Sequence, residues 1–98
     1  MRFDWTVLKA NANRQKHRVS FEEACTIFAD RSILTIGDED HSANEDRWVS
    51  MAISSAGRLL VVVHTWPEPD QLGEELVRII SARRANVHEQ RIYRERKR

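Results

Sequence analysis

The sequence predicts an α+β fold with two N-terminal helices, a four-stranded antiparallel sheet and a C-terminal helix. Three observations predict it: apolar side chains at helical spacing before residue 30, four segments of strand character between residues 33 and 82, and a polar helical segment after them. A chain of 98 residues has room for one compact core. We therefore expect residues 1–98 to form a single domain.

Two helices are expected ahead of the sheet. Residues 8–17 are rich in alanine and in straight-chain side chains, which favour a helix. Ser20 and Glu23 form the pattern of a capping box, which predicts that a second helix begins at Ser20. Apolar side chains then follow at i, i+3, i+4 and i+7 from Phe21, on one face of a helix that ends at residues 30–32.

Four strands and a closing helix are expected after these helices. The apolar run from Leu59 to Val63 does not alternate with polar residues, which indicates a central strand covered on both faces. Short connections such as Ser55–Gly57 favour antiparallel pairing, whereas residues 2–5 are too few to predict a further strand. The expected bounds are 33–36, 47–54, 58–66 and 76–82 for the strands, 37–46 for a polar loop, 67–73 for an excursion and 85–93 for the final helix.

Charge is distributed unevenly along the chain, although the net charge is only +1. Residues 83–98 contain seven Lys or Arg and two Glu, whereas residues 38–46 contain five acidic residues and no Lys or Arg. A basic end suits contacts with phosphates, and an acidic segment repels them. Because a charge run is more often a solvated surface, charge alone leaves nucleic-acid binding open.

The composition argues against a membrane protein and against a disulfide scaffold. The longest apolar run is too short to cross a bilayer, and the N-terminus lacks the apolar stretch of a secretory signal. Cys25 is the single cysteine, so it has no partner for a disulfide within the chain, and it falls on the apolar face of the second helix. We therefore expect a cytoplasmic protein with a buried thiol.

The polar loop supplies candidate proton carriers. His41 and Glu45 are spaced to form an acid–base pair, and Arg47 begins the strand that follows them. The spacing of these groups and of Asp38 matches no known metal-ligand pattern. We therefore predict a site without a metal.

Two other histidines have structural explanations as well as functional ones. Lys16 and His17 end the first helix, where they either complement its dipole or contact phosphate. His64 lies in the apolar third strand, where a lone histidine is more often a hydrogen-bonded core residue than a catalyst.

Arginines gather along the fourth strand and its exit. Regular alternation would place Arg78 and Arg84 on one side of the sheet and Ser81 and Arg83 on the other. Guanidinium groups bind phosphates through two parallel hydrogen bonds, and they bind carboxylates in the same way. These arginines are therefore candidates for phosphate binding or for ion pairs within the chain.

The sequence lacks a phosphate-binding glycine loop, a nucleophile elbow and a Cys-x-x-Cys pair. Cleavage of RNA needs none of these, because the 2′-hydroxyl is an internal nucleophile. The protein need only align it, stabilise the charged phosphorane and move protons. Trp48, Trp66 and Tyr93 are candidates for base stacking, although a core position is favoured for the two tryptophans.

One pattern of residues extends over nearly the whole chain. Its members are Trp5, Lys9, Ala10, Asn13, Lys16, His17, Val19 to Ala24, Asp38, His41, Ser42, Glu45, Arg47, Gly57, Arg58, Thr65, Arg78 to Ala85, Glu89 and Tyr93. In residue type and order this pattern resembles the BrnT family of toxins from type II toxin–antitoxin modules. A resemblance of this extent is more specific than any single motif.

The resemblance implies a RelE-like fold and a ribonuclease activity that inhibits translation. It also implies neutralisation by a BrnA-type antitoxin with a ribbon-helix-helix domain, through which alone the complex contacts DNA. Toxin and antitoxin would pair two by two in a heterotetramer, and no cofactor is expected. Two alternatives stay open, namely a nucleic-acid-binding module without catalysis and a module that only binds its antitoxin.

The resemblance also assigns candidate roles to individual residues. Arg78 and Arg83 are the first candidates for phosphate binding, and either His41 or His17 carries the proton. The candidate catalytic residues are His17, His41, Glu45, Arg47, Arg78 and Arg83. The candidate RNA-binding residues are Lys16, Arg58, Arg84 and Tyr93.

Three positions depart from the family pattern. Thr6 stands where the family commonly has an acid, which weakens the expected cap of the first helix. Arg18 replaces a glycine that would relieve a left-handed helix end, so either Arg18 costs roughly 1 kcal/mol there or the helix ends differently. Residues 67–75 form a longer connection than the resemblance leads us to expect, which would alter antitoxin contact or substrate access.

Overall fold

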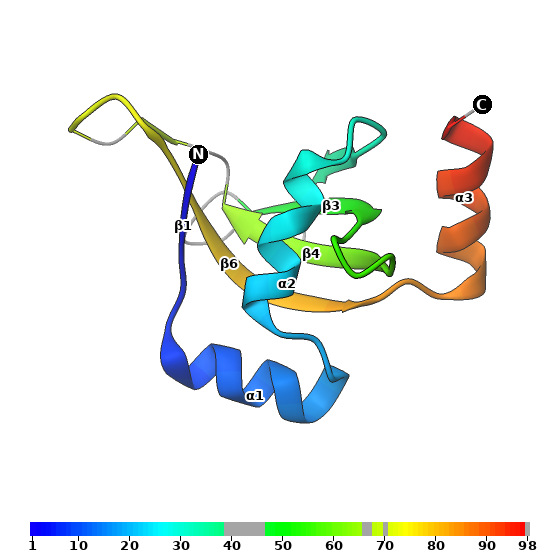
Figure 1. The fold of residues 1–98 in the computed structure, drawn as a ribbon, viewed down its shortest axis with the longest axis horizontal. Coiled ribbons are helices and arrows are strands. Elements are labelled where there is room, and N and C mark those ends of the chain that lie inside the picture. Colours follow the sequence, from blue (N-terminus) through cyan, green and yellow to red (C-terminus); the bar gives the residue numbers. More distant parts are fainter. Residues whose placement is uncertain (39–46, 66–67, 70, 98) are drawn as a thin grey trace.

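The computed structural model describes residues 1–38, 47–65, 68–69 and 71–97, which form a sheet with α1 and α2 on one side and α3 at one end (Figure 1). None of the helices described is long and apolar enough to cross a membrane. In chain order the elements are β1 (Arg2–Asp4), α1 (Val7–His17), α2 (Phe21–Cys25), the 3-10 helix η1 (Thr26–Ala29), β2 (Leu34–Gly37), β3 (Arg47–Ile53), β4 (Leu59–Thr65), β5 (Glu68–Pro69), β6 (Glu75–Arg84) and α3 (Val87–Lys97).

The sheet is mixed rather than antiparallel. Its strands lie in the order β1-β6-β4-β3-β2, with β5 paired to β6. All neighbours are antiparallel except β1 and β6, which pair in parallel with Asp4 opposite Arg78. The predicted α+β class is confirmed. The predicted four-stranded antiparallel sheet that follows two N-terminal helices is wrong, because β1 precedes both helices and adds a parallel pair.

Tertiary packing, rather than strand length, holds β1 in place. The Phe3 ring packs against Phe28 with centroids 5.4 Å apart, and Trp5 meets Phe21 edge-on at 5.9 Å. These partners lie far away in the sequence, and a strand of three residues is too short for its own alternation to predict it.

Two apolar clusters lie on opposite faces of the sheet. The larger cluster includes Phe21 and Leu60, and it fills the space between the first face of the sheet and the helices α1, α2 and η1. The smaller cluster consists of Met51, Val61 and Tyr93 and lies on the second face, where Tyr93 is contributed by α3. The central strand β4 is therefore covered on both faces, as predicted.

The second helix begins at the predicted N-cap, Ser20, although only one of the two hydrogen bonds of the capping box forms. The Ser20 hydroxyl accepts a hydrogen bond from the Glu23 N–H at 3.0 Å. The α-helix gives way to η1 at Thr26, whose hydroxyl donates to the Glu23 carbonyl at 2.6 Å. Cys25 packs half-buried against the larger cluster, and burial raises the pKa of its thiol to about 11.

Both ends of α1 are capped. The Thr6 hydroxyl accepts from the Lys9 N–H at 3.2 Å, so threonine provides the N-cap. Arg18 has a φ of 59°, in the left-handed region, and its N–H donates to the Arg14 carbonyl at 2.9 Å. The left-handed helix end predicted at Arg18 is therefore present, with a strain of roughly 1 kcal/mol.

A β-bulge interrupts β6. Val63 of β4 pairs with Ser81 and His64 pairs with Ile79, so Ile80 has no partner on β4. One extra residue in a strand shifts the alternation of side chains beyond it.

The bulge places two arginines on the same face of the sheet. Val77, Ile79 and Ala82 are all buried in the larger cluster on the first face. Arg78 and Arg83, which lie next to them in the strand, therefore both belong to the second face. The alternation expected from the sequence placed these two arginines on opposite sides, and it is wrong because β6 is not regular.

Candidate functional site

Polar side chains form a row across four neighbouring strands on the second face. Arg47 of β3 lies opposite Thr65 of β4, and the N–H of Arg78 in β6 donates to the Thr65 hydroxyl at 2.9 Å. Two strand spacings, about 10 Å, separate the backbones of Arg47 and Arg78. We call Arg47, Thr65 and Arg78 the arginine row. Asp4 lies opposite Arg78 at one end, and the Asp38 N–H donates to the Arg47 carbonyl at 2.8 Å at the other.

The Arg78 side chain forms an exposed, weak ion pair. It is 52% exposed, and its Nε donates to Oδ1 of Asp4, itself 43% exposed, at 3.3 Å. An exposed pair of this kind contributes about 1 kcal/mol or less. The bond to Asp4 uses only the Nε of Arg78, so a phosphate can bind the terminal nitrogens of the same planar guanidinium.

Arg83 lies on the same face but is bound to α3. Its two terminal nitrogens donate to the two carboxylate oxygens of Glu89, each at 2.8 Å. Glu89 also exchanges hydrogen bonds with Asn86 in a capping box at the start of α3. The hydrogen bonds of the ion pair raise the pKa of Arg83 and lower the pKa of Glu89. Arg83 therefore attaches α3 to β6, and it reaches a phosphate only by leaving Glu89.

Arg58 forms an ion pair that joins α2 to the start of β4. Its guanidinium binds both carboxylate oxygens of Glu23, with Nε 2.9 Å from Oε2, and the Ser54 hydroxyl donates to the same carboxylate at 2.7 Å. The hydrogen bonds from Arg58 hold the pKa of Glu23 below its usual value, despite the opposing effect of burial. Arg58 is thus engaged within the fold.

Replacing Glu23 by glutamine is expected to lower the free energy of unfolding at neutral pH by about 1.5–3 kcal/mol, the usual contribution of hydrogen bonds to charged groups. The pKa of Glu23 is lower in the folded chain than its ordinary value of 4.5. The charged pair therefore stabilises the fold above that pH, and the contribution is lost as the pH falls through the lowered pKa. Urea unfolding at neutral pH and near pH 3 should show the difference between parent and variant shrinking in acid.

The control for this experiment is Glu22→Gln, because Glu22 is an exposed glutamate in the same turn of α2. It should change stability by less than about 1 kcal/mol. A Glu23→Gln effect that stays constant with pH would contradict the role assigned to the ion pair.

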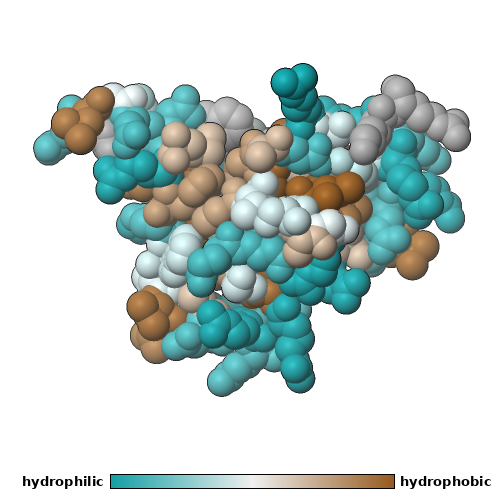
Figure 2. Space-filling model, viewed as in Figure 1, coloured by the Kyte–Doolittle hydropathy of each residue, from teal (hydrophilic) through white to brown (hydrophobic). Residues whose placement is uncertain are grey.

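Three of the predicted residues lie near the start of β4, whereas the arginine row crosses its end. They are Lys16, His17 and Arg84. Arg58, just before β4, donates to the Arg18 carbonyl at 3.4 Å, and Arg84 pairs with β4 near its start. The two ends of β4 are about 20 Å apart. Hydrophilic side chains gather at the C-terminal end of α1, whereas hydrophobic ones are exposed at its N-terminal end (Figure 2). The structure therefore does not bring His17 to the arginine row.

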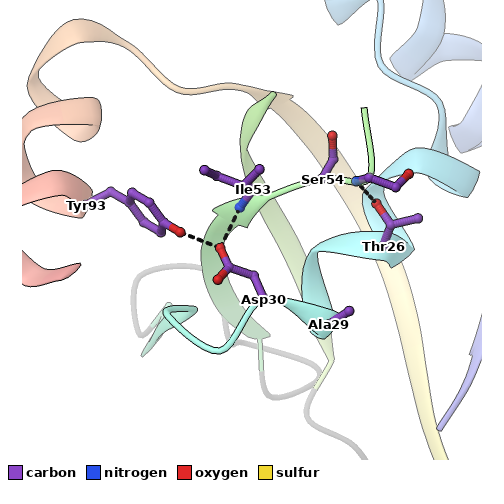
Figure 3. Close-up of a pocket in the computed structure, with 7 residues that line it drawn as sticks. Thr26, Ala29, Asp30, Ile53, Ser54 and Tyr93 are labelled. Atoms are coloured by element: carbon purple, nitrogen blue, oxygen red, sulfur yellow. Dashed lines mark hydrogen bonds between the residues drawn. The ribbon is translucent and has the colours of Figure 1, made fainter. Parts of the chain in front are cut away.

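Tyr93 anchors α3 to the body of the domain. It is 3% exposed, and its hydroxyl donates to Asp30, which also accepts from the Ile53 N–H at 2.9 Å (Figure 3). Burial, followed by the hydrogen bond to Asp30, raises the pKa of Tyr93 to about 12. In this position its ring presents no open face to a base. A shallow cavity of about 530 Å³ beside it is lined by Thr26, Ala29, Asp30, Ile53, Ser54, Ser55 and Tyr93.

His64 is a hydrogen-bonded core residue, as predicted. Its Nε2 lies 2.6 Å from the Ser50 hydroxyl and its Nδ1 lies 2.7 Å from the Thr65 carbonyl oxygen. Its ring meets Phe28 edge-on at 5.0 Å, and burial lowers its pKa. Both ring nitrogens are thus used inside the core.

Some predicted residues lie outside the described part of the chain. These are His41 and Glu45, so the predicted acid–base pair stays a prediction, and also Trp66. In the part that the structure describes, no group of three or more His, Cys, Asp or Glu side chains is placed to hold a metal ion.

Sequence reasoning missed Asp4 as a neighbour of the arginine row. The available pattern was the alternation of Phe3, Asp4 and Trp5, in which a polar residue separates two aromatic ones. With β1 in the sheet, this alternation places the aromatic side chains in the core and the carboxylate on the second face.

The comparisons with known proteins identify a family. Residues 5–89 match the family model described as the ribonuclease toxin BrnT of type II toxin–antitoxin systems. A search of curated proteins found no match. The matched segment contains α1, α2, η1, the strands β2 to β6 and the start of α3, and thus every residue of the arginine row. The chain therefore belongs to the BrnT family of ribonuclease toxins from type II toxin–antitoxin systems.

Proposed function

We propose that this chain is an endoribonuclease that binds the RNA backbone across the arginine row and cleaves it there. The family supplies the reaction class. The observation that carries the proposal is the placement of Arg47 and Arg78 on one face of the sheet, with Thr65 between them. Two arginines on one face, two strands apart, suit a phosphate and the charge that develops on it.

The chemistry proposed needs little from the protein beyond position and charge. The 2′-hydroxyl of the RNA attacks the adjacent phosphorus, and the arginines stabilise the negative charge of the phosphorane. We propose that the reaction is independent of a metal ion. His41 and Glu45, which precede Arg47 in the chain, are the proposed proton carriers.

Lys16 and Arg84 are proposed to contact the RNA away from the cleaved bond. Both are exposed cations near the opposite end of β4. Phosphate contacts of this kind add affinity without sequence preference and weaken with salt. For Arg58, Arg83 and Tyr93, the proposed RNA contacts would require that their present partners be exchanged.

A type II system supplies a protein antitoxin as the partner of this toxin. We propose that the antitoxin is of the BrnA type, with a ribbon-helix-helix domain, and that two toxins and two antitoxins form a heterotetramer. DNA would be contacted only through the antitoxin. Cleavage of cytoplasmic RNA by the free toxin would inhibit translation.

The purified chain is expected to cleave single-stranded RNA in the presence of a chelator and to leave 2′,3′-cyclic phosphate and 5′-hydroxyl ends. The same oligonucleotide without 2′-hydroxyls should stay intact, because it lacks the nucleophile. RNA that is bound in a salt-dependent way but never cut would favour a binding module without catalysis. Cleavage that needs an added divalent ion would refute metal independence.

A further inference from the structure

We propose that Asp4 is the general base of this site and takes the proton from the attacking 2′-hydroxyl. This inference rests on the proposed function, since it assumes that RNA is cleaved at the arginine row. It concerns a residue of β1, which lies outside the segment that matches the family model.

The position of Asp4 is fixed by the core on both sides of it. Phe3 packs against Phe28, and Trp5 packs against Phe21, both within the larger cluster on the first face. Successive side chains of a strand point to opposite faces, so Asp4 must point to the second face.

The parallel pairing of β1 with β6 then brings Asp4 to the arginine row. Asp4 lies opposite Arg78, and its Oδ1 accepts from the Arg78 Nε at 3.3 Å. With 43% of its side chain exposed, the carboxylate can be reached from solvent. When Arg78 holds the phosphate of an RNA, the ribose that carries the attacking 2′-hydroxyl would therefore lie beside this carboxylate.

A second carboxylate lies at the other end of the row. Asp38 continues the pairing of β2 with β3 and lies opposite Arg47. We assign the base to Asp4 because its carboxylate touches the more exposed of the two arginines. A base must lie within hydrogen-bond reach of the hydroxyl while the arginine holds the phosphate.

The proposed step exchanges one bond to phosphorus for another and moves one proton to Asp4. The Asp4 carboxylate takes the 2′-hydroxyl proton while O2′ forms a bond to phosphorus. The bond between phosphorus and O5′ breaks, and O5′ takes up a proton from water. The products are a 2′,3′-cyclic phosphate and a 5′-hydroxyl. Arg78 holds the phosphate and the base in one hydrogen-bonded arrangement.

The test is Asp4→Asn in the full chain, with two readouts. Single-turnover cleavage of RNA is expected to slow by about 100- to 10,000-fold, the usual contribution of a positioned base. Binding of the matching oligonucleotide without 2′-hydroxyls should be unchanged or tighter, because a negative charge beside the phosphate is removed. Asp4→Glu keeps a carboxylate and should recover part of the rate.

The matched control is Glu74→Gln, a carboxylate that pairs with Arg2 at 3.8 Å on the same edge of the sheet. It should cleave at the parental rate. An Asp4→Asn variant that cleaves within threefold of the parent would overturn the assignment. So would one that loses affinity together with rate, since Asp4 would then only position Arg78. Loss of cleavage in Asp38→Asn, with Asp4→Asn active, would move the base to the other end of the row.

Failure of this inference can be told apart from failure of the proposed function. If the parent does not cleave RNA, or if Arg47→Ala and Arg78→Ala both cleave like the parent, the arginine row is not a cleavage site. Asp4 is then not a general base either. If the parent cleaves and depends on Arg78 but not on Asp4, only the general base is wrong.

Discussion

Replacing Arg78 by alanine is expected to slow RNA cleavage by about 100- to 1,000-fold, the usual effect of removing one preorganised group that stabilises charge in a transition state. Arg78 is exposed, and its side chain makes one hydrogen bond, to Asp4. Its loss should therefore cost the fold about 1 kcal/mol or less. Single-turnover cleavage and thermal unfolding, measured on the same preparation, separate the two effects.

The control for Arg78→Ala is Arg91→Ala. Arg91 is an exposed arginine on α3, outside the arginine row, and its removal lowers the net charge by the same amount. We expect it to cleave within a few-fold of the parent. If both variants lose the same activity, cleavage depends on total charge and not on the row. If Arg78→Ala keeps the parental rate, the arginine row is not the site of cleavage.

Arg78 and Arg83 look equivalent in the sequence, and the structure separates them. Both lie in β6 and both belong to the second face. Arg83 is held by a bidentate ion pair with Glu89, whereas Arg78 is held by a single bond to Asp4. The difference arises from the helix that follows β6, and no property of the strand itself indicates it.

Features that depend on neighbouring residues could be predicted from the sequence. The N-cap of α2 forms as predicted, because the Ser20 hydroxyl and the Glu23 N–H belong to one helical turn. The apolar run in β4 is covered on both faces, and His64 within it is a bonded core residue. In each case the local pattern indicates the environment, although distant residues such as Phe28 and Ser50 form part of it.

Features that depend on distant residues could not be predicted. β1 joins the sheet by pairing Asp4 with Arg78, which lies 74 positions away. The bulge at Ile80 follows from how β4 and β6 pair, and the composition of β6 gives no sign of it. The first feature supplies Asp4 to the candidate site, and the second places Arg83 on the same face of the sheet as Arg78.

Replacing Asn13 by alanine is expected to lower the free energy of unfolding by about 3 kcal/mol, because three buried backbone groups lose their partner. The Asn13 side chain donates to the carbonyls of Val19 at 3.0 Å and Ala82 at 2.8 Å, and it accepts from the Ala82 N–H at 3.0 Å. It thus pairs with β6 as a neighbouring strand would, beyond the point where the short β1 ends. In a domain of this size the midpoint of thermal unfolding should fall by about 12–24 °C.

Asn11→Ala is the matched control, since it makes the same chemical change two residues away on the exposed side of α1. Alanine favours a helix more than asparagine does, so this variant should be as stable as the parent or slightly more so. If Asn13→Ala unfolds at the same temperature as Asn11→Ala, water replaces the lost side chain and the edge of β6 needs no partner from α1. A large difference in unfolding temperature between the two variants would show that one amide side chain satisfies the edge of β6 where β1 is too short to pair with it.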